Sequence, residues 1–220
     1  MKKTFILIII LISSFSCKDK LSIDYANDLS PCMNSNDIEL LNEACRVFEE
    51  NLNKRYNGIE IGKAYTQFLK DLEFTDVPPQ FFLSHKSKQI LQKIKDSKTF
   101  EKIWIKQSLL EKSDNIEIIE FASAESKEDY WNDMDFYCTN PKGEFLDCLI
   151  KNNKNESIID FLSIITTEPG LSPVITSKSI VDNLQSNEYD NGLIRLMITT
   201  CFYYEIGLII DYQNTVGNNS

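Results

Sequence analysis

The spacing of apolar residues is the feature that most constrains the fold of this chain. Between residues 36 and 57 these side chains recur at alternating gaps of three and four, at Ile38, Leu41, Cys45, Phe48, Leu52 and Tyr56. That spacing places them on one face of an α-helix. Asn36 and Glu39 have the spacing of a capping box at its start, and Asn57-Gly58 is typical of its end. A second helix with the same period, over residues 61–72, must end before Pro78-Pro79.

The same helical period returns over most of the remaining chain. Apolar residues predict helices over residues 84–112 with a division near Ser97, and over residues 130–138, 145–150, 158–165 and 174–184. Residues 116–121 suit either a strand or a helical turn, and we interpret them as helix. Glycine and proline are scarce, at seven and six residues, which favours helices over a turn-rich β fold. The sequence therefore predicts an all-α, single-domain bundle of roughly seven to nine amphipathic helices, with stacked helical hairpins as one arrangement.

The most apolar internal stretch, Gly192 to Ile210, has two interpretations. As a helix it would be about 28 Å long, close to the thickness of a bilayer. Arg195 and Glu205 interrupt it, and each would cost about 2.5 to 3.5 kcal/mol inside lipid. A bundle of amphipathic helices also needs an apolar element to pack around. We therefore predict a buried core helix in preference to a membrane span.

The N-terminus has the layout of an export signal. Met1-Lys2-Lys3 is basic, and Thr4 to Ile12 is an apolar run that is too short to cross a bilayer. The stretch LISSFSC, which ends at Cys17, resembles the signal of bacterial lipoproteins. The resemblance implies that residues 1–16 are a signal peptide and that Cys17 is acylated and anchors the chain to a membrane. Ordinary secretory cleavage at Ser-x-Ser is the alternative.

The residues after this cysteine suggest a destination and a domain boundary. The stretch CKDK, residues 17–20, is similar to the tag that sends some Gram-negative lipoproteins to the outer face of the outer membrane. This similarity implies an outer-membrane anchor, with the body facing either the periplasm or the cell surface. We expect residues 17–35 to be the lipidated N-terminus and tether, residues 36–212 the helical domain and residues 213–220 a tail.

Five further cysteines bear on the disulfides: Cys32, Cys45, Cys138, Cys148 and Cys201. Export would place them in an oxidising compartment, where disulfides form and persist. An odd number leaves at least one thiol free unless chains pair with one another. We predict the two pairings that are local in sequence, Cys32 with Cys45 and Cys138 with Cys148. The last cysteine lies in the apolar stretch and is predicted to be a small buried side chain.

The net charge of the chain limits the classes of partner that it can bind. It has 33 acidic and 23 basic residues, and removal of Lys2 and Lys3 leaves 21 basic residues and a net charge of −12. Such a charge repels phosphate backbones, which disfavours nucleic acid and allows a basic protein. The charges also form blocks, with a net +5 over residues 84–112 and a net −7 over residues 114–135. We expect these blocks to lie against one another as solvated faces, with a docking face as the alternative.

The sequence has no recognised catalytic constellation. The one histidine, His85, excludes a multi-histidine metal site within one chain and is expected to be exposed at a helix start. The G-x-S-x-G, Walker and G-x-G-x-x-G motifs do not occur. We therefore predict no enzyme activity, no metal and no cofactor.

The segment DYWNDMDFY, Asp129 to Tyr137, is the best candidate for a site, because it mixes carboxylates with aromatic rings. A glycosidase-type pair would need one carboxyl kept protonated by burial beside an ionised partner. An amphipathic helix in an acidic protein has the same mixture, and we favour a binding surface over catalysis. The predicted partner-binding residues are Glu125, Asp129, Tyr130, Trp131 and Asp133.

These observations predict a binding protein at the cell envelope. The first hypothesis is an interaction protein that neutralises a basic secreted toxin, with the acidic segment steering the partner. The second is a glycan-binding or glycan-active protein that uses the same Tyr130-Trp131 region. The third is a structural accessory subunit of an envelope complex. Salt distinguishes the first two, because charge-steered binding weakens with ionic strength and stacking on a neutral sugar does not.

Overall fold

The structure is a computed structural model that describes residues 24–110 and 136–217. Within these residues the chain is helical apart from one two-stranded sheet, which confirms the prediction of an all-α single domain. The first half contains the 3₁₀ turn η1 (Asn27–Leu29), α1 (Ser35–Arg55), α2 (Ile61–Glu73), α3 (Pro79–Phe82), α4 (His85–Lys95), α5 (Thr99–Ile103), β1 (Trp104–Lys106) and η2 (Gln107–Leu109). The second half contains β2 (Tyr137–Thr139), α7 (Glu144–Asn152), α8 (Glu156–Thr167), α9 (Pro173–Asn183), η3 (Glu188–Asp190), α10 (Gly192–Ile198), the π-helical turn η4 (Thr199–Tyr204) and α11 (Glu205–Gly217).

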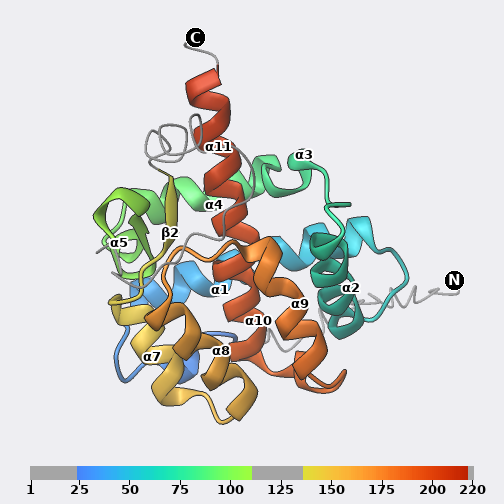
Figure 1. Cartoon of the computed structure of the whole chain (residues 1–220), viewed down its shortest axis with the longest axis horizontal. Helices are drawn as coiled ribbons and strands as arrows, with labels where there is room; N and C mark the ends of the chain where they lie inside the picture. The colour runs from blue at the N-terminus through green and yellow to red at the C-terminus, as the bar shows by residue number, and fades with distance from the viewer. Residues whose placement is uncertain (1–23, 111–135, 218–220) are drawn as a thin grey trace, which may run out of the picture.

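The central element is the continuous rod formed by α10, η4 and α11, around which the other helices are arranged (Figure 1). Among the described residues, Gly192–Thr215 is the one helix that is long and apolar enough to cross a membrane by composition, and 83% of its most apolar window is buried inside the protein. The prediction of a core helix is therefore confirmed. Its apolar character is explained by packing on all sides, as expected for a helix at the centre of a bundle.

Helix α1 begins two residues earlier than the sequence spacing predicts. Asn34 is the N-cap: its side-chain oxygen accepts from the Asp37 N–H at 3.0 Å, and the Asp37 carboxylate accepts from the Asn34 N–H at 3.1 Å. The predicted box at Asn36 and Glu39 is thus wrong, although the motif itself is present. The Asp37 carboxylate also accepts from Thr99 Oγ1 at 2.7 Å and from Lys102 at 3.0 Å. These further contacts explain why the capping box forms at Asp37.

Aromatic side chains join the central rod to α1, α2 and α3. Phe48 of α1 stacks on Tyr203 of η4 with ring centroids 4.3 Å apart, and it makes an edge contact with Phe68 of α2 at 5.0 Å. Phe81 and Phe82 of α3 also contact the Tyr203 ring. Such pairs each add about 0.5 to 1.5 kcal/mol beyond the apolar area they bury.

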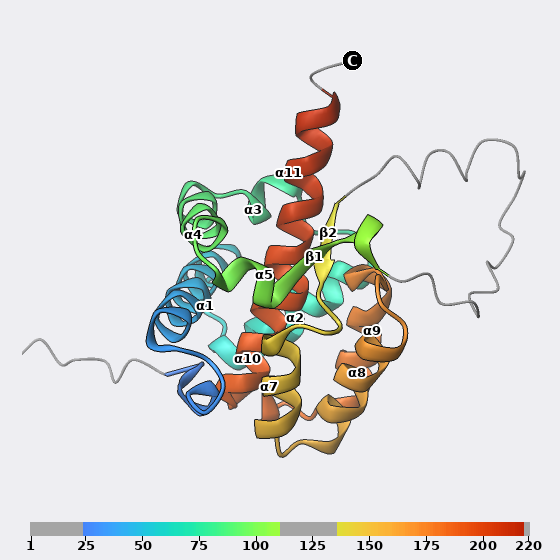
Figure 2. The ribbon, with the colours of Figure 1, turned by 90° about the vertical axis from the view of Figure 1, so that its left-hand side faces the viewer.

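The helices predicted over residues 84–112 and 130–138 are wrong at the ends that approach each other in space. The first ends at Ile103, and the chain continues as β1, while Tyr137 and Cys138 belong to β2. The two strands pair antiparallel, with Ile105 opposite Cys138, and lie beside the central rod (Figure 2). The helix preference of these short apolar runs is overridden by pairing between distant parts of the chain. The helix predicted over residues 116–121 lies outside the described residues.

The folded domain is larger than the boundaries 36–212 allow. Tyr25, Ala26, Leu29 and Met33 are buried in the core, so the predicted tether cannot include them. The Asn42 side chain on α1 accepts hydrogen bonds from the N–H groups of residues 25 and 26, at 2.8 and 3.1 Å. These backbone bonds are why a polar, turn-rich stretch is nevertheless ordered. At the other end α11 continues to residue 217, into the predicted tail. The predicted signal peptide and Cys17 lie outside the described residues.

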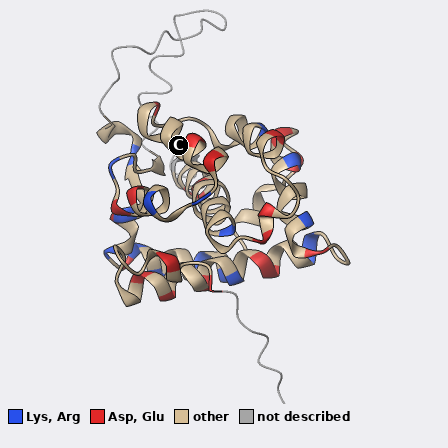
Figure 3. Cartoon of the chain, turned by 90° about the horizontal axis from the view of Figure 1, so that it is seen from below, with Lys and Arg blue, Asp and Glu red and all other residues tan. Residues whose placement is uncertain are grey.

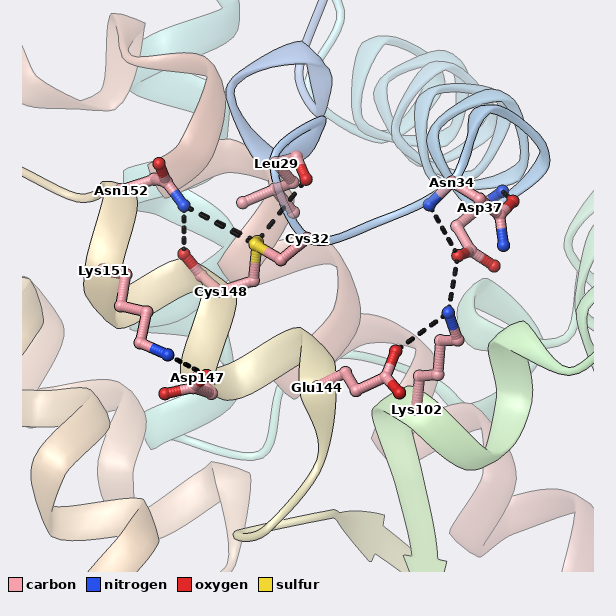
Figure 4. The surroundings of a disulfide bond; sticks show 10 residues. All are labelled: Leu29, Cys32, Asn34, Asp37, Lys102, Glu144, Asp147, Cys148, Lys151 and Asn152. Atoms are coloured by element: carbon pink, nitrogen blue, oxygen red, sulfur yellow. Dashed lines mark hydrogen bonds and ion pairs between the residues drawn. A yellow bond between two sulfur atoms is a disulfide. The ribbon is translucent and has the colours of Figure 1, made fainter.

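The disulfide prediction is wrong in its connectivity. Cys32, in the turn before α1, is bonded to Cys148 on α7, 116 residues away (Figure 4). Cys45, Cys138 and Cys201 are free and buried. Sequence proximity misleads here because Cys45 is fully buried in the core on α1, whereas Cys32 is exposed in the turn before that helix. The buried position predicted for Cys201 is confirmed.

Several lysines of the basic stretch pair with carboxylates of other described helices. Lys86 and Lys93 of α4 pair with Glu50 and Glu43 of α1, at 2.5 and 2.6 Å. Lys102 of α5 pairs with Asp37 and with Glu144 of α7, at 3.0 and 2.9 Å (Figure 4). Figure 3 shows basic and acidic residues interspersed over the helices. The predicted packing against residues 114–135 lies outside the described residues.

Candidate functional site around Glu205

Glu205 occupies an unusual place on the central rod. It follows directly after the π-helical turn η4, and only 4% of it is exposed. Single π-helical turns within α-helices are uncommon and are frequent at functional sites. A carboxylate at such depth is also uncommon unless it is paired or protonated. These two features make Glu205 the starting point of the candidate site.

The carboxyl group is held by one residue of β2. Glu205 Oε2 accepts from the Thr139 N–H at 2.9 Å and from the Thr139 hydroxyl at 2.5 Å. Thr139 lies opposite Trp104 in the sheet, but its N–H is donated to the carboxyl group, on the side of β2 away from β1. An unpaired strand edge is a liability in an isolated two-stranded ribbon. The hydrogen bonds between Thr139 and Glu205 therefore hold the two-stranded sheet against the central rod.

A small cavity lies against this carboxyl group. Its volume is about 10 Å³, and it is lined by Thr139, Phe161, Ile165, Gly170, Leu171, Pro173, Thr176, Cys201 and Glu205. Such a volume is enough for one group the size of a water molecule. Ile165, Gly170, Leu171 and Thr176 are only half-buried, so the cavity lies directly beneath the surface between α8 and α9. The site therefore combines a buried acid with a narrow, mostly apolar entrance.

The ionisation of the site is governed by burial. Burial raises the pKa of Glu205 to about 8, and the two hydrogen bonds from Thr139 offset only part of this shift. Burial also raises the pKa of the Cys138 and Cys201 thiols to about 12, with a smaller contribution from Glu205. At neutral pH the carboxyl group is mainly protonated and both thiols are neutral and weakly reactive.

The raised pKa predicts that Glu205→Gln stabilises the protein at neutral and alkaline pH. Below the ordinary carboxyl pKa of 4.5 both the folded and the unfolded chain hold this proton, so its ionisation does not lower the free energy of unfolding. As pH rises towards 8 the unfolded chain releases the proton while the folded chain retains it, so wild-type stability falls. At pH 7 the variant should gain up to about 3 kcal/mol in free energy of unfolding. Urea unfolding at pH 5 and pH 8 measures this difference.

The exposed Glu101→Gln is the matched control for this charge change, because Glu101 lies on the surface of α5. It should leave the pH dependence of the wild type intact. An equal pH dependence in Glu205→Gln and the wild type would show that this carboxyl group does not titrate as described.

The residues predicted from the sequence as a partner-binding surface, Glu125, Asp129, Tyr130, Trp131 and Asp133, lie outside the described residues and stay a prediction. The described chain does locate the two ends of their segment. The Gln107 N–H donates to the Phe136 carbonyl at 2.8 Å, so described residues on the two sides of residues 111–135 lie next to each other. Gly170 on the cavity rim lies close to the side chains of Gln107 and Leu110. The candidate cavity therefore lies near the last described residues before position 111.

Sequence reasoning missed the role of Glu205, which it considered only as a cost to membrane insertion. The available signal was a single carboxylate within a long apolar helix. Its partner Thr139 carries no sequence signal of its own. His85 is exposed at the first position of α4, as predicted. Among the described residues, no group of three or more His, Cys, Asp or Glu side chains is placed to hold a metal ion.

Comparison with known proteins returns no relative. No family model, no curated protein and no solved structure matches this chain.

Proposed function

We propose that this protein is a lipid-anchored envelope protein that binds a basic protein partner, for example a secreted toxin that it neutralises. The anchor is Cys17, which places the domain at the outer membrane. The disulfide between Cys32 and Cys148 supports an exported, oxidising location. The described residues begin at Asp24, seven residues beyond Cys17, and a stretch of this length can reach at most about 25 Å. The body would thus work close to the membrane surface.

The observation that carries the binding role is the arrangement of charge around the acidic segment. Three lysines of the neighbouring basic stretch, Lys86, Lys93 and Lys102, pair with carboxylates of α1 and α7. Residues 114–135 carry a net charge of −7, and the strands that precede and follow them in the chain, β1 and β2, pair with each other. A concentrated negative charge attracts a basic partner and speeds its association.

The test uses cross-linking on intact cells that express the full chain, followed by binding measurements on the captured protein. Wild type should capture a basic protein, and Asp129→Asn/Asp133→Asn should weaken its binding at least about tenfold, mainly through slower association. Binding to the wild type should also weaken as salt rises from low to physiological concentration.

Asp147→Asn/Asp182→Asn is the matched control, because it removes the same charge from two exposed helical positions outside the segment. It should retain nearly all of the affinity. Equal binding by the two double variants would refute the role of the segment. Capture of a neutral glycan with no response to salt would favour the glycan-binding alternative.

A further inference from the structure

A groove lies between α8 and α9, on the side of the hairpin that they form. The two helices are neighbours in space (Figure 2). The groove has a volume of about 150 Å³ and is lined by Ser157, Ile158, Asp160, Phe161, Ile164, Ser179, Ile180, Asn183 and Leu184. An apolar cavity of about this volume can hold a benzene ring. The groove therefore has room for one aromatic or branched apolar side chain.

The floor of the groove is apolar, whereas its rim is polar. Ile158, Phe161, Ile180 and Leu184 are at most 8% exposed, and Ile164 continues the apolar surface with 45% of its area exposed. The polar residues of the lining are exposed or half-buried: Ser157, Asp160, Ser179 and Asn183. A single exposed apolar residue needs no explanation, but an exposed residue that extends an apolar groove with a polar rim is typical of an interaction site.

Two carboxylates of α8 lie along this groove without a counterion. Asp160 lines the groove, and Glu156 precedes it by four residues, which places both on the same face of the helix. Among the described residues neither of them has an ion-pair partner. Lys178, the one basic residue of α8 and α9, pairs instead with Glu73 and Asp182, at 3.7 and 3.0 Å. Like charges at this spacing repel each other, so a cation bound beside them is favoured.

We propose that the groove between α8 and α9 binds one apolar side chain of the basic protein partner, while a neighbouring lysine or arginine of that partner pairs with Asp160 and Glu156. The identity of the occupant rests on the proposed function, whereas the shape and charge of the groove rest on α8 and α9 alone. An apolar anchor in a pocket with a polar rim is the usual centre of a protein interface. The groove would thus select a side chain, which charge steering by residues 114–135 cannot do.

The test titrates the full chain with the tripeptide acetyl-Lys-Phe-Lys-amide and follows the isoleucine δ1 methyl groups by NMR. The signals of Ile158, Ile164 and Ile180 should shift and saturate, whereas the signal of Ile38 on α1 should not move. Acetyl-Lys-Ser-Lys-amide lacks the apolar anchor and should bind at least about tenfold more weakly. Acetyl-Glu-Phe-Glu-amide keeps the anchor but is repelled by the rim, and it should bind at least about threefold more weakly.

Ser179→Trp tests the shape of the groove, because it places a large ring inside it. This variant should show no saturable shift with the tripeptide. Ser163→Trp is the matched control, since Ser163 is exposed on α8 and does not line the groove, and it should bind as the wild type does. Thermal melts first establish that each variant is folded. Undiminished binding by a folded Ser179→Trp overturns the proposal, as does the absence of a saturable shift in the wild type.

Glu156→Gln/Asp160→Asn tests the charge of the rim and keeps the proposal testable if Ser179→Trp does not fold. It should weaken tripeptide binding about two- to tenfold. Asp28→Asn/Glu39→Gln removes the same two charges from exposed positions on η1 and α1 and should bind as the wild type does. Equal binding by the two double variants overturns the role of the rim.

Two further measurements separate this proposal from its alternatives. A response to benzylammonium with none to the tripeptide would assign the groove to a small organic cation and overturn the assignment to a protein. Asp129→Asn/Asp133→Asn should still bind the tripeptide as the wild type does, so failure of the acidic segment and failure of the groove are distinguishable.

Discussion

Reducing the Cys32–Cys148 disulfide should lower the free energy of unfolding by about 4 to 5 kcal/mol. The bond joins residues 116 positions apart, so it closes more than half of the chain into one loop. A crosslink over a long loop removes much of the conformational freedom of the unfolded chain, and this raises the free energy of the unfolded state. A loss of this size is a large fraction of the stability of an ordinary domain.

The surroundings of the bond indicate which part of the protein would loosen. Cys148 is buried on α7, while Cys32 is exposed in the turn before α1 (Figure 4). The turn follows Leu29, which is fully buried and lies in η1 next to α7. Without the bond, residues 24–33 are held to the body by the backbone bonds to Asn42 and by apolar packing. Amide hydrogen exchange should therefore rise first in these residues.

Denaturant unfolding with and without a reducing agent measures the effect, and peptide mapping without reduction should recover a linked pair containing residues 32 and 148. Cys32→Ser should behave as the reduced protein does. Cys201→Ala should keep the sensitivity of the wild type to reduction, because Cys201 is a free thiol. An unfolding midpoint that does not change on reduction would contradict the prediction.

Arg195→Met is expected to destabilise the protein by about 4 kcal/mol. The arginine is 2% exposed at the start of the central rod, and its guanidinium pairs with Glu49 of α1 at 3.2 Å and with Asp190 of η3 at 2.8 Å. Its Nε donates to the Tyr189 carbonyl at 2.6 Å, and the group lies 5.6 Å from the Tyr65 ring centroid. The Arg195 side chain thus contacts α1, α2 and η3 from its position on α10.

The size of this effect follows from what the substitution leaves behind. Glu49 is largely buried, and apart from Arg195 it accepts a hydrogen bond from the Tyr65 hydroxyl at 3.4 Å. Removing one member of a buried pair leaves the other desolvated and without compensation, which costs more than the pair contributes. For that reason Arg195→Met/Glu49→Gln should recover part of the lost stability.

Urea unfolding of the two single variants and the double variant completes a double-mutant cycle. Lys86→Met is the control, because it breaks an exposed pair with Glu50 and should cost less than about 1 kcal/mol. If Arg195→Met costs no more than this control, the buried network does not stabilise the fold as we infer.

The helices were predictable because their information is local. In α7 and α8 the buried residues are apolar and include pairs three and four apart, and the segments predicted for α7, α8 and α9 match the observed helices closely. Each helical hydrogen bond joins residues four apart, so the sequence of one segment contains most of what its helix requires. The central rod was also predictable from its sequence. Arg195 and Glu205 within it would be costly inside lipid, which favoured a helix in the protein core over a membrane span.

The strands were not predictable on the same basis. Trp104–Lys106 and Tyr137–Thr139 are three residues long, too short for an alternating pattern to be distinguished from a turn of helix. Their hydrogen bonds are made to one another across more than thirty residues. The tertiary structure alone decides this pairing.

The sequence by itself determined the helical class, the buried rod, the acidic charge and the resemblance at Cys17 to a lipoprotein signal, because these depend on composition and on neighbours a few residues apart. Only the tertiary structure decided that Cys32 bonds to Cys148, that four residues before α1 belong to the core and that Thr139 meets Glu205 beside a cavity. Each of these contacts joins segments that are distant in the chain. Side chains at such separations have no periodic relation to one another, and they meet only when the packing of the helices brings them together.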